Sequence, residues 1–316
     1  MVSIVIPAYN EENAVGETVN DVRKVMKKSS YKEFEVIVVD DGSSDNTAER
    51  AKKAGAFVIS HPHNAGYGRA LKTGITNAKF DKVVITDADG TYPSVKIVDI
   101  LKLFDTGFDM VVGERTGKNY RESPLKWPMR LLLRFLVEWT TGRKIPDINS
   151  GFRVFSKKTI ITYFGQLCDT FSFTTSATLA YMMTSKFVAC TKIEYSERVG
   201  SSHVRLWSDS LRTLQYIIQA ITYYNPLKIF ILLSVGCLVL AFVSIFIGIL
   251  FSMHTGFMMV VGFLLIIFVA LIISEQTLAQ KYNTKLFQSI LGFLHSLKLV
   301  ITDLKIISRV IALQLI

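Results

Sequence analysis

Two carboxylates one residue apart, Asp87 and Asp89, follow the apolar run Val83–Thr86. Carboxylate oxygens are hard ligands that suit a divalent cation, and such an ion commonly joins a protein to the phosphates of a nucleotide. An isolated Asp-x-Asp triplet more often serves a turn or caps a helix. The triplet therefore predicts a metal–diphosphate site only if other segments supply further binding groups beside it.

Two further polar turns come directly after apolar, strand-like runs. Pro7–Glu12 follows Val2–Ile6, and Asp40–Asp45 follows Phe34–Val39. Helix capping explains each turn singly, with Asn10 as a cap and acidic residues near the helix start. Three such turns at successive strand ends instead indicate a site where a divalent metal offsets the charge and carboxylates bind a base and a ribose.

The elements that must position these turns alternate between strand and helix. The expected strands are Val2–Ile6, Phe34–Val39, Ala56–Ser60, Val83–Thr86 and Met110–Val112, and the expected helices are Glu12–Lys28, Thr47–Ala54, Gly68–Ala78 and Val95–Phe104. Alternation at this pitch predicts an α/β fold with a doubly wound, mostly parallel sheet. Ligands of such sheets bind beyond the carboxyl ends of the strands, where the three polar turns fall.

Charge is unevenly spread along the 316 residues, whose formal net charge is +10. Residues 1–114 carry 14 basic and 17 acidic side chains, whereas residues 115–158 carry 11 basic and 3 acidic ones. Basic and aromatic residues together can bind nucleic acid. Trp and Leu among Arg are more typical of a membrane interface, so we expect segment 115–144 to lie there and expect no nucleic-acid partner.

Composition also indicates membrane segments, because half of the residues are hydrophobic and the mean hydropathy is +0.34. Ile229–Phe251 carries no charge and is long enough to cross a bilayer, and a second apolar run, Phe257–Ile273, follows a short break. Lys and Arg flank the pair outside but not in the break, which places both ends in the cytoplasm. The cysteines have neither zinc-site nor disulfide-framework spacing.

Four motifs, in this order, resemble those of the family 2 glycosyltransferases with a GT-A fold: Pro7–Glu11, Asp40–Asp45, Asn64–Ala70 and Asp87–Gly90. Asp147–Arg153 and the paired apolar runs narrow the resemblance to polyprenyl- and dolichol-phosphate hexosyltransferases, the group that is similar to dolichol-phosphate mannose synthase. The resemblance implies inverting transfer of a hexose from a nucleotide sugar, of the GDP-mannose or UDP-glucose type, to a dolichyl or undecaprenyl phosphate. It also implies Mg²⁺ or Mn²⁺ as cofactor.

The resemblance further implies a role for individual residues. Those that would hold the nucleotide sugar are Pro7, Tyr9, Glu11, Val38, Asp40, Arg69, Asp87 and Ala88. The metal would be bound by Asp89, with Asp87 beside it and Thr91 where some relatives carry a Gln ligand. The arginines that would face the acceptor phosphate and the donor diphosphate are Arg115, Arg130 and Arg198. Those that would shape the acceptor side are Asp147, Ser150 and His203, the last in place of a family lysine.

The sequence thus predicts an integral membrane protein with its catalytic domain in the cytoplasm. The expected parts are a GT-A domain over 1–205, an amphipathic juxtamembrane helix over 206–225, two transmembrane helices over 226–273 and a C-terminal amphipathic helix over 274–316. The apolar C-terminal segments also offer surfaces for a homo-oligomer.

Two other functions stay open at this point. A processive polysaccharide synthase usually carries a Gln-x-x-Arg-Trp motif and more spans, and neither is found in this sequence. A catalytically silent membrane adaptor with the same fold would not need the intact Asp87–Asp89 triplet or Asp40.

Overall fold

The computed structural model describes residues 1–117 and 147–196 without interruption. It also describes residues 135, 137–139, 141–144, 214, 215, 217–221 and 223, and scattered positions between 236 and 270. The chain forms two compact units, Met1–Ala220 and Ile221–Ile316, and the predicted site residues that the structure describes all belong to the first.

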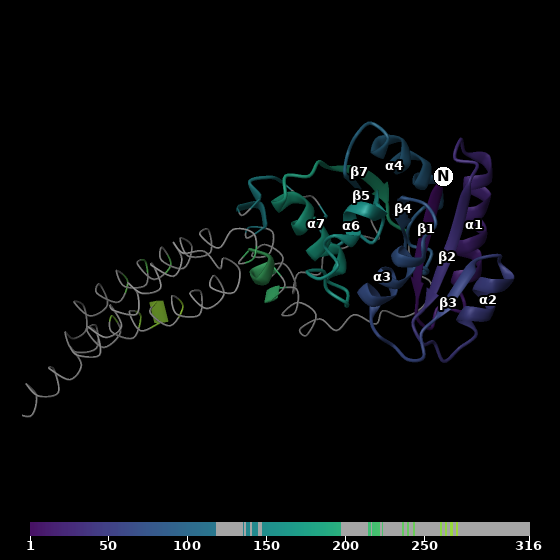
Figure 1. The fold of residues 1–316 in the computed structure, drawn as a ribbon, viewed down its shortest axis with the longest axis horizontal. Coiled ribbons are helices and arrows are strands. Elements are labelled where there is room, and N and C mark those ends of the chain that lie inside the picture. Colours follow the sequence, from purple (N-terminus) through teal and green to yellow (C-terminus); the bar gives the residue numbers. More distant parts are fainter. Residues whose placement is uncertain are drawn as a thin grey trace, which may run out of the picture. The chain divides into compact units, whose positions relative to one another are not determined.

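A seven-stranded mixed sheet with the strand order β3-β2-β1-β4-β6-β5-β7 forms the centre of the first unit (Figure 1). The strands are β1 Val2–Ala8, β2 Phe34–Asp40, β3 Phe57–Ser60, β4 Lys82–Ile85, β5 Met110–Thr116, β6 Arg153–Ser156 and β7 Val188–Glu194. Neighbouring strands are parallel except where β6 pairs with β4 and with β5. The predicted mostly parallel sheet and its five predicted strands are thus confirmed.

Helices cover both faces of the sheet (Figure 1). They are α1 Val15–Lys28, α2 Thr47–Lys53, α3 Tyr67–Asn77, α4 Ile97–Phe104, α6 Lys157–Ile161 and α7 Phe173–Met183, with a 3-10 turn, η1, over Ser94–Lys96. The four predicted helices are α1 to α4. The sequence pattern did not predict α6, α7, β6 or β7.

Strand β1 is buried along its whole length because helices pack on each face of it. Alternate residues of a strand point to opposite faces, so Ile4 and Ile6 join the core that includes α1 and α4. Val5 faces α3 instead, where a Cβ on Gly74 would lie 2.4 Å from its Cγ1 atom. Burial on both faces explains why the parallel strands are continuous apolar runs in the sequence.

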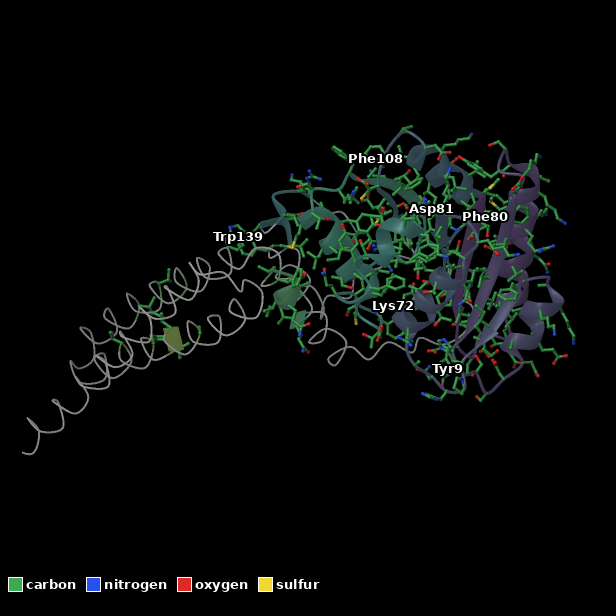
Figure 2. All side chains as sticks on the ribbon, in the orientation of Figure 1. Tyr9, Lys72, Phe80, Asp81, Phe108 and Trp139 are labelled. Atoms are coloured by element: carbon green, nitrogen blue, oxygen red, sulfur yellow. The ribbon has the colours of Figure 1, made fainter. Side chains whose placement is uncertain are left out.

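The antiparallel direction of β6 decides where the following site residues lie. Arg153, its first residue, pairs with Ile85 of β4 and with Val112 of β5. The segment that precedes β6 therefore reaches the same edge of the sheet as the turns that follow β1, β2 and β4. Figure 2 shows Tyr9, after β1, and Asp81, before β4, at opposite ends of the sheet.

The guanidinium of Arg153 is fully buried, and it ties the segment before β6 to α7. Its N–H groups donate to the carbonyl oxygens of Ser150 (2.8 Å), Ile148 (2.9 Å) and Thr174 (2.9 Å) and to the hydroxyl of Thr178 (2.7 Å). Burial lowers the pKa of Arg153 to about 10, so the group stays charged at neutral pH. A cation that satisfies several buried carbonyls at once is difficult to replace.

We expect Arg153→Ala to lower the free energy of unfolding by about 3 kcal/mol or more, because buried carbonyl oxygens lose their donors. The urea midpoint, followed by circular dichroism, measures the change. Lys102→Ala, an exposed cation on α4, is the control and is expected to change the free energy by less than about 0.5 kcal/mol. Equal midpoints for the two variants would contradict this role of Arg153.

Most of the predicted membrane segments fall outside the described residues, as does the predicted boundary at residue 205. Within the part of the chain that the structure describes, no helix combines the length and apolar character needed to cross a bilayer. The hairpin over 226–273 and the amphipathic segments stay predictions.

Candidate functional site

Reciprocal hydrogen bonds join the loops that follow β1 and β2. The backbone N–H of Asn10 donates to Ser43 Oγ (2.9 Å), and the N–H of Ser44 donates to Asn10 Oδ1 (2.9 Å). The N–H of Glu11 donates to Thr47 Oγ1 (2.8 Å). Asn10 has a φ of 53°, a left-handed conformation that Asn tolerates. Asn10 thus holds two loops together, and its alternative interpretation as a helix cap is wrong because α1 begins only at Val15.

The residues predicted to hold the nucleoside lie along these two strands and loops. Pro7 and Val38 are buried within β1 and β2, and Asp40 pairs in register with Ala8. The carboxylate of Asp40 accepts a hydrogen bond from the N–H of Ser43 (3.1 Å). Tyr9 and Glu11, both half-buried, follow β1 directly. The structure therefore brings the predicted nucleoside residues to one edge of the sheet.

Asp41, next to Asp40, binds the loop that precedes α3. Its buried carboxylate accepts hydrogen bonds from the backbone N–H groups of Ala65 (3.0 Å) and Gly66 (2.8 Å), and it lies 2.7 Å from Nδ1 of His61. The Nε2 atom of His61 lies 3.0 Å from Thr73 Oγ1 of α3. Asp41 thus fixes the loop that enters α3, a role that its place in the sequence did not predict.

The start of α3 packs closely against segment 167–170. The N–H of Arg69 donates to the carbonyl of Asp169 (2.9 Å), and Lys72 Nζ forms an ion pair with the Asp169 carboxylate (2.6 Å). A Cβ on Gly68 would lie 2.3 Å from the Cys168 carbonyl oxygen, so this approach requires glycine. Lys72 is labelled in Figure 2. Arg69 itself is exposed on the first turn of α3.

Both carboxylates of the Asp87–Asp89 triplet are held by hydroxyl groups. The hydroxyl of Tyr67 donates to Asp87 Oδ1 (2.8 Å). Asp89 Oδ1 accepts from the hydroxyl (2.6 Å) and the N–H (3.2 Å) of Thr91, and both residues are buried. Ala88 between the two aspartates is also buried. The triplet, which follows β4 after one intervening residue, therefore has both of its carboxylates oriented.

Arg115, at the end of β5, forms a bidentate ion pair with Asp147. Its Nε lies 2.7 Å from Asp147 Oδ2, and its Nη2 lies 2.9 Å from Oδ1. Burial alone would raise the pKa of the Asp147 carboxyl, but the hydrogen bonds and charge of Arg115 outweigh it and lower this pKa. The Tyr195 ring, centred 5.5 Å from Arg115 Cζ, packs on the cation. Ser150, fully buried, accepts from Arg153 through its carbonyl oxygen.

A comparison with protein families gives this site its context. The profile described as Glycosyl transferase family 2 matches residues 3–164 of the 316-residue chain. The chain belongs to glycosyl transferase family 2. The matched range contains β1 to β6 and every site residue described above except those of segment 167–170 and Tyr195.

Three curated relatives are similar over about half of this chain. An uncharacterized protein of Methanocaldococcus jannaschii is 40% identical over 172 residues, which are 52% of this chain and 68% of the relative. A dolichyl-phosphate hexose transferase of Haloferax volcanii is 32% identical over 49% of this chain and 66% of its own. An undecaprenyl-phosphate 4-deoxy-4-formamido-L-arabinose transferase of Pseudomonas fluorescens is 33% identical over 51% and 48%. This chain thus spans between about half and two thirds of these relatives' lengths.

Solved structures share the fold. Glucosyl-3-phosphoglycerate synthase from Mycobacterium tuberculosis, in complex with phosphoglyceric acid, gives a TM-score of 0.58 at 19% identity, covering 70% of this chain and 79% of that one. The same enzyme with Mn²⁺, uridine-diphosphate and glucosyl-3-phosphoglycerate gives 0.57 at 20% identity, with the same coverage. At this identity the likeness concerns the fold, and it confirms the mixed α/β sheet expected of a GT-A domain.

The donor atoms of this family 2 site fit a hard divalent cation. Asp87 and Asp89 offer carboxylate oxygens, which Mg²⁺ and Mn²⁺ prefer. Among the described residues no group of three His, Cys, Asp or Glu side chains could hold a metal ion. An ion held by one or two carboxylates usually takes its other ligands from substrate phosphates and water. The role of Thr91 as a ligand stays a prediction, and its hydroxyl here supports Asp89.

Three predicted site residues, Arg130, Arg198 and His203, lie outside the described residues, so their places in the site stay predictions. The structure adds Asp41, His61 and Tyr67 as residues that hold the predicted groups. Asp41 and Tyr67 belong to motifs identified from the sequence. Their hydrogen bonds, which the sequence does not show, distinguish their supporting roles from the binding roles predicted for neighbouring residues.

We expect Asp147→Asn to lower the free energy of unfolding at pH 7 by about 2–3 kcal/mol, because it removes the buried negative charge that pairs with the Arg115 cation. The folded-state pKa of Asp147 is lowered, so its contribution is present above the unfolded pKa of about 4 and is lost as pH falls through the folded pKa. The difference between wild type and variant should therefore shrink below about pH 4.

Urea unfolding across this pH range measures the difference. Asp99→Asn is the control, because Asp99 forms an exposed ion pair with Lys96 (2.8 Å) and should contribute about 0–1 kcal/mol. A difference for Asp147→Asn that does not change with pH would contradict the assignment.

Proposed function

We propose that this chain is an inverting, metal-dependent glycosyltransferase that moves a hexose from a nucleotide sugar to a polyprenyl phosphate. The observation that carries the proposal is that the Asp87–Asp89 triplet, Asp40 and the Arg115–Asp147 pair lie at one edge of a family 2 sheet. The names of two relatives, a dolichyl-phosphate and an undecaprenyl-phosphate transferase, support the acceptor class.

Two tyrosine rings connect the donor and acceptor sides of this site. The Tyr195 ring lies beside the Arg115 cation, and its centre lies 5.5 Å from the centre of the Tyr92 ring. The hydroxyl of Tyr92 accepts a hydrogen bond from the N–H of Gly151 (2.8 Å), and Gly151 in turn lies against Asp87. A donor bound at the triplet would therefore lie close to an acceptor beside Arg115.

On the donor side, Asp40, Tyr9 and Glu11 would bind the base and ribose, and Asp87 and Asp89 would face the diphosphate. A divalent ion bound there supplies a Lewis acid that stabilises the negative charge on the departing nucleoside diphosphate. The hydrogen bonds between the β1 and β2 loops preorganise the nucleoside pocket, so less conformational entropy is lost on binding.

On the acceptor side, the phosphate needs positioning more than a general base. A phosphate monoester has a second pKa near 6, so its oxygen is largely ionised at neutral pH. This oxygen would attack the anomeric carbon while the bond to the diphosphate breaks on the opposite side, and its electron pair leaves with the nucleoside diphosphate. In-line displacement inverts the anomeric centre. The guanidinium of Arg115 would bind the acceptor phosphate, and the carboxylate of Asp147 would hold the plane of that guanidinium.

We also propose that the reaction takes place at the cytoplasmic face of a membrane. The predicted spans over 226–273 would anchor the protein, and the basic segment 115–144 would lie at the interface and present the lipid phosphate. The positive charge of that segment and the acceptor class of the relatives support this location.

We expect Asp89→Ala to reduce glycosyl transfer about 1,000-fold, or about 4 kcal/mol of transition-state stabilisation, because a metal ligand is lost. Membrane extracts supplied with radiolabelled UDP-glucose, GDP-mannose or UDP-N-acetylglucosamine, polyprenyl phosphate and Mn²⁺ measure lipid-linked product. Asp89→Asn keeps the shape of the buried side chain and separates lost chemistry from lost folding.

Asp21→Ala, an exposed carboxylate on α1, is the control and should keep full activity. Absence of lipid-linked product from the wild type with every donor would overturn the proposal. Full cellular activity of Asp89→Ala would favour a catalytically silent adaptor instead.

A further inference from the structure

Tyr67 is held firmly at the first turn of α3. Its ring stacks on that of Phe171, with the ring centres 5.5 Å apart and an angle of 19° between the planes. Its hydroxyl donates to Asp87 Oδ1 at 2.8 Å, although the two residues are 20 positions apart in the chain. The stacking fixes the ring, and the fixed ring presents its hydroxyl to a single carboxylate oxygen.

The Tyr67 hydroxyl donates to a carboxylate oxygen at 2.8 Å, and hydrogen bonds to carboxylates are among the stronger types.

The backbone of Gly151 packs closely against the Tyr67–Asp87 hydrogen bond. A Cβ at this position would lie 2.7 Å from Asp87 Oδ1, 2.9 Å from Asp87 Oδ2 and 2.8 Å from the Tyr67 hydroxyl oxygen. All three distances are too short for a carbon atom, so only glycine leaves room for the pair. The N–H of Gly151 donates to the hydroxyl of buried Tyr92, which fixes this backbone in place.

We propose that Tyr67 is a positioning residue that sets the orientation of the Asp87 carboxylate toward the metal and diphosphate of the donor. This inference rests on the proposed function. A carboxylate rotates about its terminal bond with little hindrance. The Tyr67 hydroxyl on one oxygen and the closely packed backbone of Gly151 therefore restrict Asp87 to one orientation. Partners that orient a ligand in this way typically change metal affinity 10- to 100-fold.

Tyr67→Phe removes the hydroxyl and keeps the ring that stacks on Phe171. We expect the dissociation constant for Mn²⁺, measured by electron paramagnetic resonance of free Mn²⁺ with saturating UDP or GDP, to rise about 10-fold. The KM for the nucleotide sugar should rise with it. The matched control is Tyr31→Phe, because the Tyr31 hydroxyl donates to the Asp105 carboxylate at 2.7 Å, outside the site. This variant should bind Mn²⁺ like the wild type.

A double-mutant cycle separates positioning from a general effect on the fold. In an Asp87→Ala background, Tyr67→Phe should weaken Mn²⁺ binding no further, because its target is gone. Equal Mn²⁺ affinity in Tyr67→Phe and wild type would overturn the inference, and so would equal losses with and without Asp87.

The same measurements distinguish this inference from the proposed function. A wild-type chain that fails to bind Mn²⁺ in the presence of either UDP or GDP would overturn both this inference and the proposed function. A wild type that binds Mn²⁺ with UDP or GDP, loses affinity in Tyr67→Phe and forms no lipid-linked product would overturn only the proposed acceptor.

Discussion

Electrostatic repulsion among carboxylates is the constraint that shapes this edge of the sheet. Asp40 is the last residue of β2, and Asp87 and Asp89 follow β4; these two strands flank β1, and neighbouring strands lie only about 4.8 Å apart. Two like charges about 10 Å apart, the separation of two strands that flank a third, repel by about 2 kcal/mol near a protein surface, so hydrogen-bond donors or a cation stabilise such a group. Hydrogen-bonded loops provide part of that stabilisation in the protein itself. A nucleotide diphosphate adds more negative charge, which is why a divalent cation suits the site.

The single strand that runs against the others completes the site. Because β6 is antiparallel, its first residue lies at the edge where the parallel strands end, and the segment that contains Asp147 and Gly151 meets the Asp87–Asp89 triplet there. The buried cation of Arg153 then fastens this segment to α7. The proposed donor half of the site depends on the parallel strands, and the proposed acceptor half depends on this reversal.

Strands β1, β2 and β4 could be predicted from the sequence because burial on both faces makes them apolar runs. Helices α1 and α4 could be predicted because each has one apolar, buried face. The four-residue β6 could not, since it begins with Arg153, whose burial depends in part on the carbonyl of Thr174, 21 positions away. Helix α7 has buried polar residues such as Thr174 and Thr178, so it lacks the contrast between polar and apolar faces that predicts a helix. At the site, the sequence identified Asp87 but not Tyr67, which holds it, because that contact joins residues 20 positions apart. Thr91 is only two residues from Asp89, but the sequence offered it as a metal ligand and not as the donor to that carboxylate.

The chemical type of each partner separates the aspartates by function. The guanidinium of Arg115 cancels the charge of Asp147, so this carboxylate is suited to orienting a cation and poorly suited to binding a metal. The hydroxyls of Tyr67 and Thr91 orient Asp87 and Asp89 without adding positive charge. A neutral donor restricts the direction of a carboxylate and leaves its negative charge in place, which is what a metal ligand requires. The same family 2 sheet edge can therefore hold the proposed metal-binding pair, Asp87 and Asp89, beside the Arg115–Asp147 ion pair, because the two kinds of aspartate differ in their hydrogen-bond donors.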